Sequence, residues 1–123
     1  MSFSSSQNCF KYFKELGASE VEEFWVAALN PGLNLLESKM LFRGTIDACP
    51  FYPRDLIRFL CVKNASAFVI AHNHPSGNLK PSLADEQLTA KIKTAASYHD
   101  IKVLDHIIVT PDAYYSFADE GLL

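Results

Sequence analysis

The first regular hydrophobic pattern in the chain spans residues 8–16. Phe10, Phe13 and Leu16 recur there at helical spacing, and Gly17, a residue type that often ends a helix, follows them. The pattern therefore predicts a short helix over 8–16, with an apolar face that packs against the rest of the protein.

Three later stretches are apolar without helical periodicity and predict buried β-strands, and the stretch at 38–45 predicts a further strand. The runs at 24–29 and 38–45 are separated by the turn sequence Asn-Pro-Gly at 30–32, so we expect them to form a hairpin-like pair. The runs at 65–71 and 103–110 are continuous and apolar, which is typical of strands that are covered on both faces.

Two further helices are expected between these strands. Pro53 suits the first turn of a helix, where its missing N–H needs no partner, and that helix would run to about residue 62. A loop at 72–81 then leads to apolar residues at helical spacing over 83–98. Because strands and helices alternate in a chain of 123 residues, we predict a single α/β (α+β) domain with helices packed on a central sheet.

The composition is that of a folded domain without a membrane segment. Hydrophobic residues make up 49% of the chain, which is enough for a core and argues against disorder. The net charge of −3 argues against a general binder of nucleic acid or of membrane surfaces. No apolar run approaches the ~20 residues that span a bilayer, and the three cysteines form no C-x-x-C pair. We therefore expect a cytoplasmic protein with reduced thiols.

The candidate chemistry is concentrated just after the strand at 65–71. His72 and His74 lie two positions apart, and side chains at that spacing project to the same side of an extended chain. Asp85 follows in the first turn of the next predicted helix, from which its carboxylate can return to the same point. Two imidazoles and one carboxylate form a usual catalytic zinc site, whose fourth position stays open for water. The spacing therefore predicts a metal site.

Ser82 and Asp85 also fit a simpler role. Their spacing at a predicted helix start is that of a capping box, in which both side chains accept hydrogen bonds from free backbone N–H groups. His72 and His74 alone could likewise be two polar residues of a loop. The combination of a buried strand, both histidines, a turn and the Ser–Asp pair favours the metal site. We expect His106, in the last predicted strand, as a core or supporting residue more than as a fourth ligand.

The pattern formed by these residues resembles a known motif. His72-x-His74, followed after seven residues by Ser82 and after two more by Asp85, matches the JAMM motif of the JAB/MPN zinc metallopeptidases. The fuller string at 72–85 is similar to the bacterial RadC branch of that superfamily. Further segments resemble the same branch in the same order, namely 42–45, 52–55, 64–65 and 104–109.

The resemblance covers about residues 20–123, and it implies a fold. Members of the family have a curved, mixed central sheet flanked by helices, the JAB/MPN (cytidine-deaminase-like) architecture, which we expect for 20–123. Residues 1–19 are then expected to form a short N-terminal helix and tail.

The resemblance also implies a mechanism, in which one zinc ion per chain has the ligands His72, His74 and Asp85. The family uses a glutamate from an early strand as general base, and alignment of the apolar run with the family pattern places Glu22 in this role. Glu23 is the alternative, because adjacent strand residues face opposite sides and only one of the two can point into the site. Ser82 matches the family's serine that stabilises the oxyanion of the tetrahedral intermediate.

These assignments imply a zinc-dependent metallohydrolase that cleaves a peptide or isopeptide bond in a peptide or protein substrate. The alternative is a RadC-like accessory of DNA repair or recombination, or a zinc-containing interaction module without proteolysis. DNA is the weaker candidate partner, because the charge balance does not support it. No membrane partner is expected.

Overall fold

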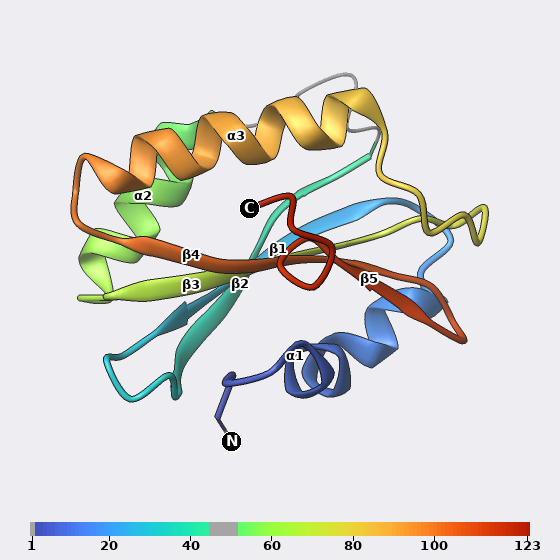
Figure 1. The fold of residues 1–123 in the computed structure, drawn as a ribbon, viewed down its shortest axis with the longest axis horizontal. Coiled ribbons are helices and arrows are strands. Elements are labelled where there is room, and N and C mark those ends of the chain that lie inside the picture. Colours follow the sequence, from blue (N-terminus) through green and yellow to red (C-terminus); the bar gives the residue numbers. More distant parts are fainter. Residues whose placement is uncertain (1, 45–51) are drawn as a thin grey trace.

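Five strands form one mixed sheet through the middle of the structure (Figure 1). The computed structural model describes residues 2–44 and 52–123. The spatial order of the strands is β2-β1-β3-β4-β5, with β3 parallel to β4 and the other neighbours antiparallel. Their bounds are β1 (Glu23–Leu29), β2 (Leu35–Arg43), β3 (Ala67–Asn73), β4 (Lys102–Val109) and β5 (Tyr114–Ser116).

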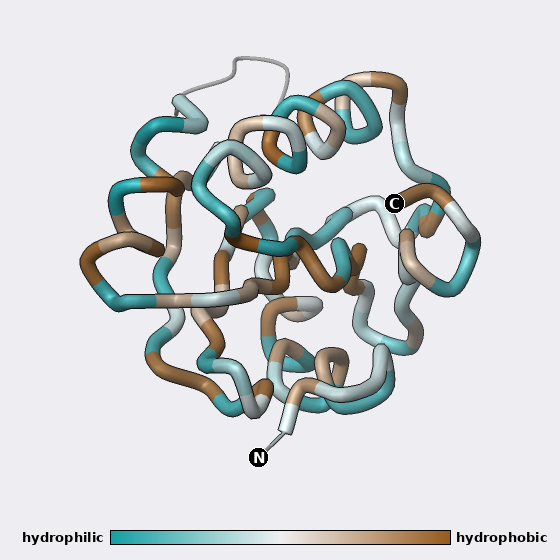
Figure 2. Tube along the Cα trace, turned by 60° about the vertical axis from the view of Figure 1, so that its left-hand side comes forward, coloured by the Kyte–Doolittle hydropathy of each residue, from teal (hydrophilic) through white to brown (hydrophobic). Residues whose placement is uncertain are grey.

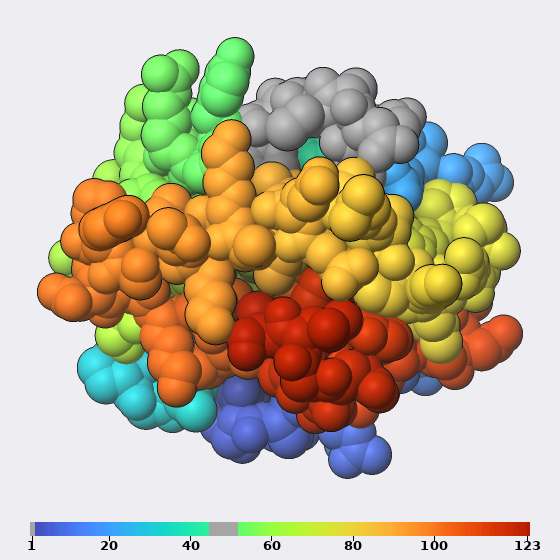
Figure 3. Space-filling view, turned by 45° about the horizontal axis from the view of Figure 1, so that its top comes forward, coloured from blue at the N-terminus to red at the C-terminus, as the bar shows by residue number. Residues whose placement is uncertain are grey.

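Helices cover both faces of the sheet. On one face lie α2 (Pro53–Val62) and α3 (Leu83–Ser97), and on the other lies α1 (Ser6–Phe13), which continues as the 3-10 helix η1 (Lys14–Ala18) (Figure 1). Figure 2 shows hydrophilic and hydrophobic residues alternating along the helical turns, as expected of helices with one face toward a core. The C-terminal segment packs alongside α3 (Figure 3).

The length and the apolar character of these helices show whether any of them could span a bilayer. Within residues 2–44 and 52–123, none of them is both long enough and apolar enough to cross a membrane.

The sheet divides the core into two layers, one under α2 and α3 and one under α1. In β1, Phe24 and Val26 face the first layer, whereas Ala27 and Leu29 face the second, and all four side chains are fully buried. The same alternation continues in β3, in which every residue is buried. Coverage of β3 on both faces explains why its sequence is a continuous apolar run.

The predicted α+β fold is confirmed, with a mixed sheet and helices packed on it. The stretch at 24–45 forms the expected hairpin of β1 and β2, although β2 begins earlier than predicted, at Leu35. Thr45, the predicted end of that strand, lies outside the described residues. The helix predicted from Pro53 is α2, and proline occupies its first turn as expected.

Within the sheet, two features differ from the predicted pattern. β3 does not end at residue 71, because Phe24 of β1 pairs with His72 and Val109 of β4 pairs with Asn73. The loop expected from His72 therefore begins later, and His72 lies on a central strand. The short strand β5 has no counterpart among the predicted elements, because its three residues are too few to form a periodic pattern.

The predicted helix at 8–16 is divided into α1 and η1, and Gly17 lies inside η1 instead of after the helix. A Cβ added to Gly17 would lie 2.6 Å from the backbone oxygen of Thr110. Glycine is thus required here by the close approach of η1 to the end of β4. Phe3 and Phe13 are buried in the layer under α1, so the N-terminal segment shares a core with the sheet.

Gly17→Ala is expected to destabilise the protein, because the new Cβ would overlap backbone atoms of Thr110. Overpacking of this kind lowers the free energy of unfolding by about 1–3 kcal/mol. Chemical denaturation measures the change, with Gly32→Ala as control, since a Cβ at Gly32 would meet only side-chain atoms of Asn34 at 3.3 Å and Asn30 at 3.4 Å. Equal stabilities of the two variants would contradict the proposed steric role.

Candidate metal centre

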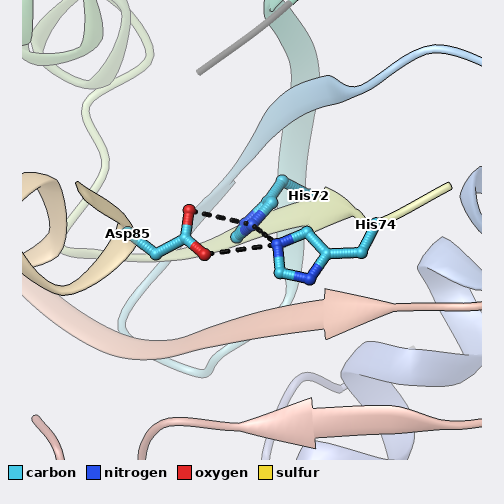
Figure 4. Close-up of side chains that lie close together, drawn as sticks. All are labelled: His72, His74 and Asp85. Carbon is cyan, nitrogen blue, oxygen red and sulfur yellow. Dashed lines mark hydrogen bonds and ion pairs between the residues drawn. The ribbon is translucent and has the colours of Figure 1, made fainter. Parts of the chain in front are cut away.

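Three side chains from neighbouring elements converge at the C-terminal end of β3 (Figure 4). His72 lies on β3, His74 follows directly after the strand, and Asp85 lies in the first turn of α3. One ligand atom from each residue lies within 4.8 Å of the others. The connection from β3 through α3 to the parallel strand β4 explains this arrangement, because α3 begins where β3 ends. The structure brings together the three residues predicted as metal ligands.

The contacts among these side chains are short. Nε2 of His72 lies 3.0 Å from Nε2 of His74. Asp85 meets the two rings with different oxygens, Oδ1 at 3.3 Å from His72 Nε2 and Oδ2 at 3.2 Å from His74 Nε2. His72 and Asp85 are buried, whereas 11% of the His74 side chain is exposed. The cluster therefore meets solvent on the side of His74.

A chain of hydrogen bonds behind His72 fixes the orientation of its ring. The hydroxyl of Thr89 donates to the backbone oxygen of Asp85 (2.7 Å), so its oxygen accepts from Nδ1–H of His106 (2.5 Å). Burial holds the pKa of His106 well below its usual range, so this ring is neutral and its Nε2 can only accept. Nδ1 of His72, 2.7 Å away, is then the donor. When His72 is neutral, its Nε2 therefore presents a lone pair to the cluster, and when the ring is protonated, Nε2–H can donate to Asp85.

His74 has the same tautomer when it is neutral. Its Nδ1 lies 2.6 Å from the backbone oxygen of Asn78, which can only accept, so Nδ1 carries the proton. Nε2 of His74 then also presents a lone pair. Two lone pairs that face each other at 3.0 Å repel unless a proton or a metal cation lies between them. Hydrogen bonding of the outer nitrogen is the usual way in which proteins orient metal-binding histidines.

Asp85 serves both the helix and the cluster. Its Oδ2 accepts from the backbone N–H of Ser82 (2.8 Å), and the hydroxyl of Ser82 accepts from the backbone N–H of Asp85 (3.0 Å). This is the complete capping box that the simpler interpretation predicts. Oδ1 is buried and accepts no hydrogen bond from the described residues. The cap therefore uses one carboxylate oxygen and leaves the other facing His72.

The charges of the cluster favour a bound cation. Burial acts to raise the pKa of Asp85, but the contacts with His72 and His74 outweigh burial and hold this pKa far below its usual range. Burial acts to lower the pKa of His74, but its hydrogen bond to Asp85 and the negative charges of Asp85 and Glu22 raise this pKa above 6.5. In the protein without a metal, these interactions favour the protonated form of His74, whose positive charge balances the carboxylate.

The donor set fits a divalent metal ion that would replace this proton. Two imidazole lone pairs and one oxygen of an ionised carboxylate face a common centre. The buried Oδ1 of Asp85 also lacks the hydrogen bond that buried polar atoms almost always have. His72, His74 and Asp85 are thus the described residues that could hold such an ion.

An open cavity of about 820 Å³ lies beside the cluster. His74 lines it together with Glu22, which directly precedes β1, and with the exposed Ser82. Glu23 instead lines a separate cavity near α1, where its Oε1 accepts from Nε1 of Trp25 (2.9 Å). Of the two candidate bases, Glu22 lines the cavity that His74 also lines, whereas Glu23 lines the separate cavity near α1.

The predicted site does not include Thr89, although its spacing from Asp85 indicates that the two side chains are neighbours. The two residues are four positions apart on α3, and therefore lie on the same face of the helix. His106, expected as a core or supporting residue, is fully buried against His72. An irregularity in the pairing of β3 with β4, between Phe68 and Val69, sets the register that places His106 there. Nothing in the amino-acid pattern marks this irregularity.

Comparison with known proteins identifies close relatives. A family model described as the RadC-like JAB domain matches residues 3–122. A UPF0758 protein of Vibrio cholerae is 43% identical over 122 residues, which is 98% of this chain and 77% of the relative. UPF0758 proteins of Aromatoleum aromaticum and Actinobacillus succinogenes are 46% and 42% identical over 109 residues each. This chain spans about half the length of these two relatives, 48% and 50% respectively.

The family model takes in α1 as well as the sheet, so the division of the chain at residue 20 stays a prediction. The match extends over nearly all of the sequence, and it includes both histidines and Asp85. On this coverage, together with the identity to the Vibrio relative, the chain belongs to the family of RadC-like JAB domains.

Proposed function

We propose that this protein is a zinc-dependent hydrolase that cleaves a peptide or isopeptide bond. The proposal is carried by the convergence of two imidazole lone pairs and a buried carboxylate oxygen beside a cavity that Glu22 also lines. Membership of the JAB-domain family and the resemblance to the JAMM metallopeptidases support it. The substrate would be a peptide or a protein.

Zinc suits these donors. It binds imidazole nitrogen and carboxylate oxygen at about 2.0–2.2 Å in tetrahedral sites, which places neighbouring donors about 3.3 Å apart. The separations of 3.0, 3.2 and 3.3 Å in the cluster are close to that distance. Three protein ligands are also the number found in catalytic zinc sites. When bound, the ion would lower the pKa of water to about 7 and polarise the substrate carbonyl.

Glu22 is the general base in this proposal. Its carboxylate lines the cavity beside His74, where it would take the proton from the attacking water and pass it to the leaving amine. Ser82 lines the same cavity. Because its oxygen accepts from the backbone N–H of Asp85, its own O–H can donate to the oxyanion that develops on the substrate carbonyl.

A DNA-binding accessory role has less support. The formal net charge of −3 does not provide the excess of positive charge on which binding to the phosphate backbone depends. Such a role would also require no general base, so variants of Glu22 separate the two functions.

Protein prepared without chelators is expected to bind about one zinc ion per chain, as a single three-ligand site requires. His74→Ala should weaken zinc binding by at least roughly 10–100-fold. Removal of a residue that only hydrogen-bonds to a metal ligand has an effect of that size, and His74 is proposed to be a ligand itself. Competition with a chromophoric chelator measures the affinity. His99→Ala is the matched control, because His99 is exposed at the end of α3. Binding by His74→Ala as tight as that of the control would exclude this metal site.

Zinc affinity is expected to fall as the pH is lowered through neutrality. The pKa of His74 is raised above 6.5 in the protein without metal, so below that pKa a proton competes with zinc for Nε2. One displaced proton lowers the apparent affinity by up to about tenfold per pH unit. The same competition assay, repeated at several pH values, measures the slope. An affinity that stays constant between about pH 5 and 8 would show that His74 is not a ligand.

Glu22→Gln should retain zinc but lower peptide-bond cleavage by roughly 10²–10⁴-fold, because a neutral amide cannot accept the proton. Glu23→Gln is the control, since this residue faces the other side of β1 and interacts with Trp25. Turnover of a fluorogenic peptide library and zinc content are measured for both variants. Loss of activity in Glu23→Gln alone would reverse the assignment, and full activity in both variants would refute the proposed mechanism.

A further inference from the structure

Asn73 lies between the two histidines of the cluster, but its side chain makes its contacts elsewhere. It is fully buried, and its Oδ1 accepts from the backbone N–H of Glu23 (2.7 Å). Its Nδ2 donates to the backbone oxygens of Ser19 (3.2 Å) and Val21 (3.0 Å). Because an N–H can only donate and a carbonyl can only accept, these partners determine the orientation of the amide.

These hydrogen bonds hold both peptide groups that flank the Cα atom of Glu22. The carbonyl of Val21 belongs to the peptide group before Glu22, and the N–H of Glu23 belongs to the one after it. One side chain therefore restrains the backbone on both sides of this residue. The backbone oxygen of Glu22 also accepts from the N–H of Gly44 (2.8 Å), which holds the second peptide group from the end of β2.

The position of Asn73 at the end of β3 explains why a side chain, and not the strand backbone, binds the segment before β1. Pairing between β1 and β3 ends at Phe24 and His72, so the backbone of β3 provides no strand pairing for residues 19–22. The amide of Asn73 supplies two donors and one acceptor to that segment instead. Asp has the same shape but offers no donor when ionised, so it cannot replace these contacts.

We propose that Asn73 is a positioning residue for Glu22. It ties the segment that carries the base to the strand that carries His72, so that the base and the metal ligands keep a fixed spacing. Asn73 donates to backbone oxygens on the α1 side of the sheet, and it is not one of the metal ligands. This inference rests on the proposed function of Glu22.

The test is Asn73→Asp in the full chain, which keeps the acceptor for Glu23 and replaces the donors by a carboxylate oxygen. Zinc affinity should stay at the wild-type level, because no ligand is changed. Amide hydrogen exchange at Glu23 should become faster, because the carboxylate repels the backbone oxygens of Ser19 and Val21 and loosens the segment before β1. This readout needs neither metal nor substrate. The kcat for peptide cleavage should fall on the order of 10²-fold with little change in KM, as expected when a catalytic group is misplaced by about 1 Å.

Asn8→Asp is the matched control, because it also removes an amide-to-carbonyl hydrogen bond, from Asn8 Nδ2 to the backbone oxygen of Ser2 (3.0 Å), and adds the same charge. If Asn73→Asp does not fold, Asn73→Ala removes the contacts without adding charge and is measured in the same way. The inference would be overturned if the Asn73 variant had the same amide hydrogen exchange and the same kcat as Asn8→Asp. It would also be overturned if the zinc affinity fell in proportion to kcat. Wild-type turnover in Glu22→Gln would instead refute the proposed function.

Discussion

An ionised carboxylate buried with an unsatisfied oxygen is the constraint around which the site is built. Asp85 is fully buried, and its pKa is held far below the usual range, so it carries its charge at neutral pH. Its Oδ1 accepts no hydrogen bond from residues 2–44 or 52–123, and a polar group left in this state costs about 1–3 kcal/mol, more when it is charged. A cation between this oxygen and the two imidazoles removes that cost. A bound cation would therefore satisfy the oxygen that the described residues leave without a hydrogen bond.

The alternation of side chains along β3 assigns different tasks to the two faces of the sheet. His72 faces the side of α3, where it meets Asp85 and His106. Asn73, the next residue, holds the backbone before β1. β4 repeats this division, because Asp105, next to His106, accepts from Ser116 Oγ (2.6 Å) on the opposite face. On both strands, the residue next to the buried histidine therefore makes its hydrogen bonds on the opposite face of the sheet.

The sequence predicts the parts of this structure that repeat a pattern. The α+β fold, the hairpin of β1 and β2 and the spacing of the three candidate ligands all follow from periodicity and from residue types at set intervals. The pairing irregularity that aims His106 at His72 leaves no such pattern, because it depends on how two distant strands align. The spacing of Thr89 from Asp85 indicates that the two share a helix face, but its contact with His106, seventeen positions away, leaves no pattern in the sequence.

The capping box and the proposed metal site use the same carboxylate, although the spacing alone makes them look like alternatives. The hydrogen bond from the backbone N–H of Ser82 orients the Asp85 carboxylate at the start of α3. The chain through His106 likewise fixes the ring of His72 as the sheet forms. Two of the three donors are therefore oriented by the fold, and the third, His74, is oriented by the hydrogen bond from its Nδ1 to the backbone oxygen of Asn78, so that only a proton on its Nε2 would have to leave when a metal binds. A site that is ordered in this way loses little conformational entropy on binding, and it can hold its geometry while the exposed side of His74 meets solvent and substrate.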